Sequence, residues 1–289
     1  MKLQPSEFIL NDDGSIYHLN LLPEDIAHTI ITVGDPDRVA AVSKYFDTIE
    51  VKKGKREFYT HTGKLNGKRI TVISTGIGTD NIDIVFNELD ALVNIDFASR
   101  TIKEELTSLD IIRIGTTGSI QVEIDVDSFL ISEYAMGFDG LVHFYESEHI
   151  QHQDIQKAFV KHTDWFYKKA SPYVVKYAEA LGKRLQSEKV TQGFTATNIG
   201  FYGPQSRKLR LDVQDENLNE SLASFEYDGK RITNLEMETS AIYAMSALLG
   251  HNAVSMNCIL ANRPRGTFSS QPKAAVDKLI QYTLEKLTA

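Results

Sequence analysis

An arginine inside an apolar stretch is the first feature of this sequence that could do chemistry. Arg113 is flanked by isoleucines in residues 111–114, and residues 115–118 add two glycines and two threonines. A buried guanidinium is costly unless an anion or a carboxylate compensates its charge. Glycines and threonine hydroxyls let a backbone approach a ligand and donate hydrogen bonds. The stretch therefore predicts an anion site, and a buried structural ion pair is the alternative.

Two carboxylates, Glu236 and Glu238, stand where a predicted strand gives way to a helix. A carboxylate can accept hydrogen bonds from a pair of vicinal hydroxyl groups, so these residues predict a site for a polyol such as ribose. The alternative is that they are helix N-terminal acids that interact favourably with the helix dipole. Neither has a His or Cys cluster nearby, so we expect no transition-metal site.

A third candidate is Gly34-Asp35-Pro36-Asp37-Arg38, where a strand ends at a glycine and a helix begins. Helix N-termini present free N–H groups and a positive dipole end to anions, and Arg38 lies in the first turn. An ordinary capped helix with a surface arginine is the alternative. No G-x-G-x-x-G sequence follows a strand, which disfavours a dinucleotide-dependent oxidoreductase.

One loop carries an aromatic ring, a carboxamide and a guanidinium, on Phe201, Gln205 and Arg207. A carboxamide both donates and accepts, which matches the edge of a uracil ring, and an arginine stabilises an oxygen that becomes negative. A plain surface loop is the alternative. The residues alone leave Arg56 undecided between a solvated strand end and a site across a subunit boundary. A lone histidine such as His18 is more often structural.

The elements that must position these residues alternate between apolar strands and amphipathic helices, which predicts an α/β fold. We expect strands over 29–33, 58–65, 68–74, 109–114, 190–197, 231–235 and 253–260. We expect helices from Pro36, over 80–98, 171–185 and 238–249, and from about Lys273, with Thr79 or Asp80 capping the second. No linker or repeat divides the chain, so residues 1–289 are expected to form a single domain.

Composition limits the classes of partner. The formal charge of −8 argues against a nucleic-acid partner. No run approaches the roughly 20 apolar residues that span a bilayer, and the N-terminus lacks the features of a secretion signal. The only cysteine, Cys258, lies in an apolar run and is expected to be a buried thiol. These features predict a cytoplasmic protein without a membrane partner.

The chain resembles the nucleoside phosphorylase family of the trimeric or hexameric type, and within it the uridine-cleaving members. Five of its segments match family motifs in the family's order: 34–38, 56–58, 74–78, 113–118 and 236–238. Residues 201–207 look like the pyrimidine-reading loop, and residues 260–263 lack the aspartate that purine-cleaving members tend to carry. The resemblance implies a three-layer α/β/α fold around a central twisted mixed sheet.

The resemblance also implies an activity, the reversible phosphorolysis of uridine to uracil and ribose 1-phosphate. This is a pentosyltransferase reaction of pyrimidine salvage, with inorganic phosphate as co-substrate and no other cofactor. The implied assembly is a homo-oligomer built from dimers, such as a hexamer. A purine nucleoside phosphorylase, a nucleosidase or a non-catalytic nucleoside-binding protein are the alternatives. Arg38 and Arg113 disfavour the nucleosidase, because water needs no cage of arginines.

Site residues follow from the same resemblance, position by position. The phosphate site would comprise Gly34, Arg38, Arg113 and Thr116, with Arg56 from a neighbouring subunit. The ribose site would comprise Met237 and Glu238 supported by Glu236, with His18 of the neighbour at the 5′-hydroxyl. The base site would comprise Phe201, Gln205, Arg207 and Arg263. The catalytic groups would be Arg113, Gln205, Arg207 and Glu238, and Glu57 resembles a position that holds a monovalent cation at a subunit interface.

Three segments depart from the family pattern. Residues 94–108 and 143–172 are longer than expected, and the second contains His162 and Trp165 without an assigned role. The loop has Tyr202-Gly203-Pro204 where the family has Tyr-Pro-Gly. The base specificity is therefore less firmly implied than the reaction type.

Overall fold

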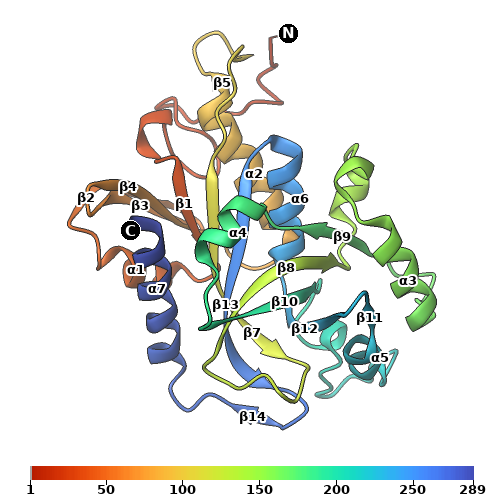
Figure 1. The fold of residues 1–289 in the computed structure, drawn as a ribbon. Helices are drawn as coiled ribbons and strands as arrows, with labels where there is room; N and C mark the ends of the chain where they lie inside the picture. Colours follow the sequence, from red (N-terminus) through yellow and green to blue (C-terminus); the bar gives the residue numbers. More distant parts are fainter. Residues whose placement is uncertain (1) are drawn as a thin grey trace.

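A mixed sheet of 12 strands with helices on both faces dominates the computed structural model, which describes residues 2–289 (Figure 1). The first half of the chain supplies β1 (Thr29–Val33), β2 (Thr48–Lys55), β3 (Phe58–Leu65), β4 (Lys68–Ser74) and β7 (Asp110–Ser119). The second half supplies β8 (Phe129–Gly137), β9 (Tyr173–Lys176), β10 (Val190–Thr197), β11 (Glu226–Tyr227), β12 (Lys230–Glu236), β13 (Asn252–Asn262) and β14 (Thr267–Phe268). The predicted α/β/α class is confirmed.

The strand order places the two predicted site strands side by side. The order is β11-β12-β10-β8-β13-β7-β1-β4-β3-β2, and β12 additionally pairs with β7. In that pairing Asn234 lies opposite Ser119 and Leu235 lies opposite Gly118. The extra pairing closes β7, β13, β8, β10 and β12 into a ring. The end of the arginine strand therefore meets the end of the strand that leads to the two glutamates.

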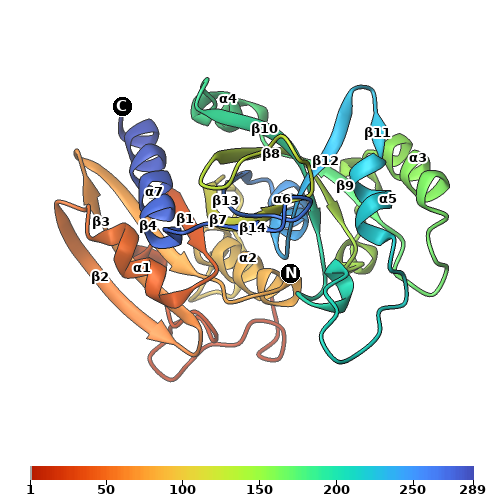
Figure 2. The same ribbon diagram turned by 90° about the horizontal axis from the view of Figure 1, so that it is seen from below.

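Two sets of helices cover opposite faces of the sheet (Figures 1 and 2). Helices α2 (Thr79–Asn94) and α6 (Thr239–Leu249) pack against each other on one face. Helices α1 (Pro36–Ser43), α4 (Glu179–Leu185) and α7 (Pro272–Thr288) lie on the other. There the Lys44 ammonium that follows α1 lies 2.6 Å from Asp277 of α7. Helices α3 (Gln153–Thr163) and α5 (Leu218–Ser224) lie beside β9 and β12 at the far end.

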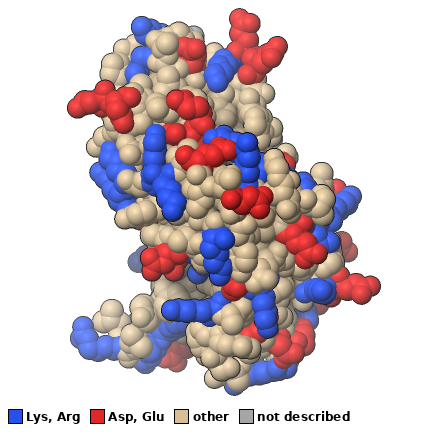
Figure 3. All heavy atoms as spheres, turned by 90° about the vertical axis from the view of Figure 1, so that its left-hand side faces the viewer, with Lys and Arg blue, Asp and Glu red and all other residues tan. Residues whose placement is uncertain are grey.

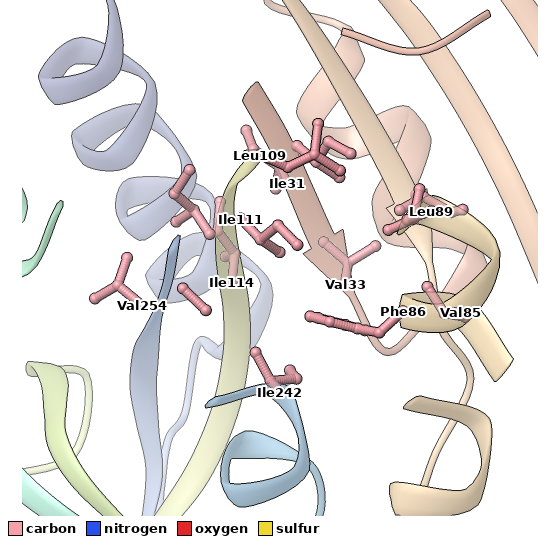
Figure 4. Packing of buried hydrophobic residues seen from close by; sticks show 14 of the residues in the cluster. Ile31, Val33, Val85, Phe86, Leu89, Leu109, Ile111, Ile114, Ile242 and Val254 are labelled. Carbon is pink, nitrogen blue, oxygen red and sulfur yellow. The ribbon is translucent and has the colours of Figure 1, made fainter. Parts of the chain in front are cut away.

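The apolar core sits between β1, β7 and β13 and the helices that cover them. Figure 4 shows Ile31, Val33, Ile111 and Phe86 packed together, and each is 0% exposed. Burying a side chain of this size contributes about 1.5–3 kcal/mol. Such packing holds β1 and β7 rigidly, and with them the polar residues at their ends.

The long segment 143–172 forms its own part of the core. It contains α3 and a loop in which the Trp165 ring stacks on Phe138, with 4.8 Å between the ring centroids. Phe159 of α3 joins the same cluster. Residues 94–108, the other long segment, form a short hairpin of β5 (Ile95–Asp96) and β6 (Thr101–Ile102). This hairpin projects from the top of the view in Figure 1.

Two predicted helices are wrong in part. Residues 171–185 do not form one helix, because Tyr173–Lys176 is strand β9, antiparallel to β8. A Tyr-Val-Val run fits a pleated surface better than a helix. The helix predicted over 80–98 ends at Asn94, and its N-cap is Gly78 with a φ of 100° rather than Thr79 or Asp80. The elements β2, β8, α3 and α5 were not predicted.

The surface and the cysteine agree with simple expectations from composition. Figure 3 shows acidic and basic side chains interspersed over one face, without a field of a single sign. None of the helices in residues 2–289 has the length and apolar character needed to cross a membrane. Cys258 is buried, as predicted, and burial raises the pKa of its thiol to about 12.

Candidate active site

A cavity of about 740 Å³ opens where β1, β7 and β12 end. This is the edge of an α/β sheet at which ligands commonly bind, and the volume is typical of a small-molecule site. Ten of the residues expected at the site line it: Gly34, Arg38, Arg113, Thr116, Phe201, Gln205, Arg207, Glu236, Met237 and Glu238. Glu57 lines it as well. The fold therefore brings together residues from five separate stretches of the sequence.

Arg113 lies at the centre of a buried polar network and is 5% exposed. Its Nη1 donates to Asn257 Oδ1 at 2.7 Å, and its Nη2 donates to Glu238 Oε2 at 2.6 Å. The same Nη2 lies 3.1 Å from Glu236 Oε2. Burial lowers the pKa of Arg113, but the two carboxylates outweigh burial and the net pKa is raised. The arginine is thus both a buried ion-pair partner and a group that lines the cavity.

A glycine makes room for this arginine. A Cβ atom on Gly115 would lie 1.7 Å from Arg113 Nη1, so no larger residue fits there while Arg113 keeps its position. From the sequence, the glycines of this stretch are predicted to let the backbone approach a ligand. For Gly115 the structure gives a different reason, which is that the side chain of Arg113 folds over it.

Glu236 is fully engaged within the protein. Its Oε1 accepts from the Thr197 hydroxyl at 2.6 Å, and its Oε2 accepts from the backbone N–H groups of Glu238 and Thr239, each at 2.9 Å. Since α6 begins at Thr239, this carboxylate binds the free N–H groups at the start of the helix. Glu236 therefore fits the role expected of it, which is to support the ribose end of the site. It is also a helix N-terminal acid, as the alternative interpretation had it.

Glu238 faces both Arg113 and the glycine turn before α2. Its Oε1 accepts from the backbone N–H of Gly78 at 2.9 Å. Burial raises the pKa of Glu238, Arg113 acts against that rise, and the nearby Glu236 adds to it. The carboxyl group therefore takes up a proton at higher pH than an ordinary glutamate.

The anion end of the cavity holds a second guanidinium. Asp35 caps α1 by accepting from the Asp37 N–H at 3.0 Å, and Pro36 is the first helical residue, as predicted. Arg38 follows in the first turn and donates to the Ile114 carbonyl at 3.4 Å. Burial and the neighbouring Arg113 both lower the pKa of Arg38. Two guanidinium groups beside a helix N-terminus favour the binding of an anion.

The opposite end of the cavity carries the loop with the carboxamide. The Arg207 guanidinium lies 3.9 Å from the centroid of the Phe201 ring and donates to Gln205 Oε1 at 2.5 Å. Arg263 stands behind this loop and donates to the Gln205 carbonyl at 2.6 Å. Burial and the nearby Arg263 lower the pKa of Arg207 to about 10. The carboxamide and a guanidinium with reduced proton affinity thus line one wall together.

Besides Arg263, two other expected residues do not line the cavity of their own chain. Arg56 is exposed at the turn between β2 and β3, with a φ of 55°. His18 is held by Glu88 of α2, whose Oε1 lies 2.6 Å from His18 Nδ1. The same carboxylate accepts from the N–H of Leu19 at 2.8 Å. Both residues were expected to act on a neighbouring subunit, so neither is required to reach this cavity.

Several contacts were missed by the sequence analysis. Asn257 interrupts the apolar strand β13, and this polar residue was a usable signal of a buried partner. The Gly78 N–H to Glu238 contact is made by the backbone and leaves no mark in the sequence. Ile77 and Phe268 line the cavity although both are largely exposed, at 68% and 66%. They supply apolar surface at its mouth.

Comparison with known proteins places this cavity in a family. Residues 28–285 match the model of the phosphorylase superfamily. A uridine phosphorylase of Thermococcus kodakarensis is 29% identical, with 89% of this chain and 81% of the relative covered. One of Haemophilus influenzae is 29% identical, with 94% of each chain covered. The structure of a Trypanosoma brucei nucleoside phosphorylase that shows uridine phosphorylase activity matches with a TM-score of 0.86 at 29% identity, covering 97% of this chain and 99% of that one.

Proposed function

We propose that this chain, which belongs to the phosphorylase superfamily, catalyses the reversible phosphorolysis of uridine to uracil and ribose 1-phosphate. One observation carries the proposal beyond the similarity. A single cavity is lined by the Arg38 and Arg113 guanidinium groups and also by the Gln205 carboxamide and Arg207, and Glu238, which accepts a hydrogen bond from Arg113, lines it too. That arrangement suits an anion, a sugar and a base held in line.

Phosphate would be bound at the first end. Arg38 and Arg113 would supply charge-assisted hydrogen bonds, and the Gly34 N–H and the Thr116 hydroxyl would supply neutral ones. The two guanidinium groups would compensate the negative charge of the phosphate after it leaves water. Because these donors are in place before phosphate arrives, little reorganisation is needed when it attacks.

Bond cleavage would begin at the other end. As the C1′–N1 bond breaks, its electron pair leaves with the base, and the sugar becomes an oxocarbenium ion. Arg207 and the Gln205 amide group would stabilise the oxygen of the uracil anion, and a donor of this kind is worth roughly 3–4 kcal/mol. A phosphate oxygen then bonds to C1′, and the proton that the phosphate loses is transferred, through solvent, to the uracil anion. No covalent enzyme intermediate is required.

The ribose would be held by Met237 and Glu238, with Glu238 accepting from the sugar hydroxyls. The Gly78 N–H and Arg113 fix the position of that carboxylate, so the sugar is oriented relative to the phosphate. His18 and Arg56 of a neighbouring subunit would complete the ribose and phosphate sites, which makes a dimer the smallest active unit. An assembly of such dimers, a hexamer, belongs to the same proposal.

A monovalent cation at Glu57 is also part of the proposal. A Cβ on Gly76 would lie 3.0 Å from Glu57 Cγ and 2.5 Å from Asn81 Nδ2, so the Glu57 and Asn81 side chains flank this glycine. The oxygens of the Glu57 carboxylate are ligands of the kind that hard cations take. Apart from phosphate as co-substrate, the proposed reaction requires no cofactor.

One assay tests the reaction against its alternatives. Uridine, thymidine, inosine and adenosine are each incubated with and without phosphate, and free base is measured. We expect uracil from uridine, released only when phosphate is present. Release of base without phosphate would indicate a nucleosidase. A preference for inosine or adenosine would indicate a purine nucleoside phosphorylase. No release from any nucleoside would indicate a nucleoside-binding protein without catalytic activity.

A further inference from the structure

Asn257 is a buried polar residue to which the proposed mechanism gives no role. It lies on β13 opposite Gly115 of β7, and it is 0% exposed. Its Oδ1 accepts from Arg113 Nη1 at 2.7 Å. Because Gly115 has no side chain, the guanidinium group can lie across the backbone of β7 and reach the neighbouring strand. Asn257 therefore anchors one side of the guanidinium group.

The carboxamide of Asn257 can face Arg113 in only one orientation. An arginine donates and cannot accept, so the amide oxygen must point towards it and the amide nitrogen away from it. On that far side Nδ2 donates to the hydroxyl groups of Ser132 and Ser255, each at 3.1 Å. Both serines are 0% exposed. Turning the amide over would place donor against donor, so Asn257 is held as an acceptor for Arg113.

Ser255 connects this amide to the carboxylate side of the arginine. Its hydroxyl lies 2.9 Å from Thr239 Oγ1, at the first residue of α6. The backbone N–H of Thr239 donates to Glu236, whose Oε2 lies 3.1 Å from Arg113 Nη2. Buried contacts thus run through the protein from one side of the guanidinium group to the other. The amide and the carboxylate therefore keep a fixed position relative to each other.

The two sides of the guanidinium group differ in charge. Nη2 faces the carboxylates of Glu236 and Glu238, whereas Nη1 faces a neutral amide oxygen. When all of them are ionised, Arg113 and its two carboxylates already carry a net negative charge. A third carboxylate in place of the amide would add to it and oppose the binding of an anion. A neutral acceptor orients the guanidinium group without this cost.

We propose that Asn257 is a positioning residue for phosphate, which holds the Nη1 side of Arg113 in place and, because its amide is neutral, leaves the positive charge of the arginine available to the anion. Asn257 is not among the residues that line the cavity, whereas Arg113 is, so it acts through Arg113 and not by contact with a substrate. It sets the affinity for phosphate more than that for uridine. This inference rests on the proposed function, which takes phosphate as the anion bound at Arg113.

Two substitutions separate position from charge. Asn257→Leu is similar in size but removes the acceptor, so Nη1 loses its anchor and phosphate should bind about tenfold more weakly. Asn257→Asp keeps an acceptor, and its second oxygen can accept from Ser132 and Ser255, but the added charge should weaken phosphate binding about tenfold or more. Isothermal titration with inorganic phosphate, without a nucleoside, measures both. Wild-type affinity in either folded variant would overturn the inference.

Another buried asparagine provides a matched control for loss of stability. Asn94, at the end of α2, is 3% exposed, and its Nδ2 donates to Asp90 at 2.6 Å and to the Thr107 carbonyl at 3.2 Å. Asn94→Leu should lower the melting temperature, as Asn257→Leu does, but should change the phosphate affinity by less than about twofold. An equal loss of phosphate affinity in both variants would assign the effect to stability and overturn the inference.

Steady-state kinetics give a second readout that lost packing alone would not produce. In Asn257→Asp the KM for phosphate should rise about tenfold or more, whereas the KM for uridine should change about twofold or less. Equal rises of both KM values would overturn the assignment to phosphate. If the wild-type protein binds no phosphate, the proposed function fails and this inference fails with it. If the wild-type protein binds phosphate and both Asn257 variants bind it equally well, the inference alone fails.

Discussion

Arg113 and Glu238 lie 125 positions apart in the sequence, and a buried hydrogen bond of 2.6 Å joins their side chains. Arg113 is proposed to bind phosphate, and Glu238 is proposed to bind ribose. Without a ligand, these two side chains bind each other. In the proposed reaction, phosphate would compete with that carboxylate for the guanidinium group, and its binding would change which hydrogen bonds Glu238 can make to the sugar. The proposed phosphate and ribose sites would then be coupled through this pair of side chains.

Replacing Arg113 should stop catalysis. Arg113→Ala removes a donor to phosphate and leaves Glu236 and Glu238 without their cation, so phosphorolysis should fall at least about 100-fold, on the order of 3 kcal/mol. Steady-state rates with saturating phosphate measure the loss. Arg231→Ala, at a half-exposed arginine that pairs with Glu123 on the surface, is the control and should stay near the wild-type rate. Near-normal turnover in Arg113→Ala would refute the assignment.

A single methyl group at position 115 should have a similar effect. Gly115→Ala places a Cβ where Arg113 Nη1 lies, so the guanidinium must leave its position beside Glu238. We expect a drop in rate of at least about tenfold, equal to roughly 1.4 kcal/mol of transition-state stabilisation. Circular dichroism and the melting temperature check that the variant is folded. A folded variant with an unchanged rate would show that the position of Arg113 is not critical.

Removing the charge of Glu238 should change the affinities for the two substrates in opposite directions. In Glu238→Gln the neutral amide competes less strongly for Arg113 than the carboxylate does, so phosphate should bind more tightly while uridine binds more weakly. Isothermal titration with each substrate measures both effects. Weaker binding of phosphate in this variant would contradict the competition described above.

The same residue predicts a pH dependence. The pKa of Glu238 is raised, so as the pH falls the wild-type carboxylate becomes protonated at a higher pH than an ordinary glutamate, and the KM for uridine should rise as it does so. Glu238→Gln cannot titrate at this position, and its KM should change only with the ionisation of phosphate, which affects both proteins equally. Parallel pH profiles of the two proteins would exclude Glu238 as the titrating group.

The carboxamide at the other end of the cavity should act on the base. Gln205→Ala should raise the KM for uridine or lower kcat, because the variant loses contacts with uracil, while the KM for phosphate changes by less than about twofold. Kinetics with each substrate varied in turn give the comparison. Unchanged kcat and KM for uridine would remove Gln205 from the base site.

Mixing two inactive proteins tests whether subunits share sites. If Arg56 acts on a neighbour's cavity, a mixed dimer of Arg56→Ala and Arg113→Ala subunits contains one intact site and one doubly altered site. Refolding the two proteins together should therefore restore activity that neither has alone. If each chain completed its own site, the mixture would stay as inactive as its components.

The sequence predicted those elements whose apolar runs are bounded by turn residues. Strands β1, β3, β4 and β10 have the predicted bounds, and the Asn66-Gly67 turn joins β3 to β4 with positive φ at both residues. Strand β9 was mistaken for a helix because its four residues are a strand only through pairing with β8. Such pairing depends on distant parts of the chain and is not visible in a local pattern.

In the candidate site, too, local sequence signals were predictable and contacts between distant segments were not. Arg113, Glu236 and Glu238 stand out locally, since charged residues interrupt or end apolar strands. That Arg113 contacts both carboxylates depends on the pairing of β7 with β12, which no local pattern specifies. A cavity of about 470 Å³ that is lined by residues of the long segment 143–172 and of the loop 201–207 was not predicted either, because it depends on how these distant segments pack together. The residue types were predictable, while their contacts came from tertiary structure.

The ring of strands closed by β12 on β7 has a consequence for how the protein is made. Its last strand in the chain, β13, ends at Asn262, so a ribosome must have synthesised most of the polypeptide before the ring is complete. Pairings between such distant segments form slowly during folding. A nascent chain that stops before residue 230 lacks Glu236 and Glu238, the two carboxylates that pair with Arg113. The newborn protein therefore acquires its candidate active site only near the end of translation.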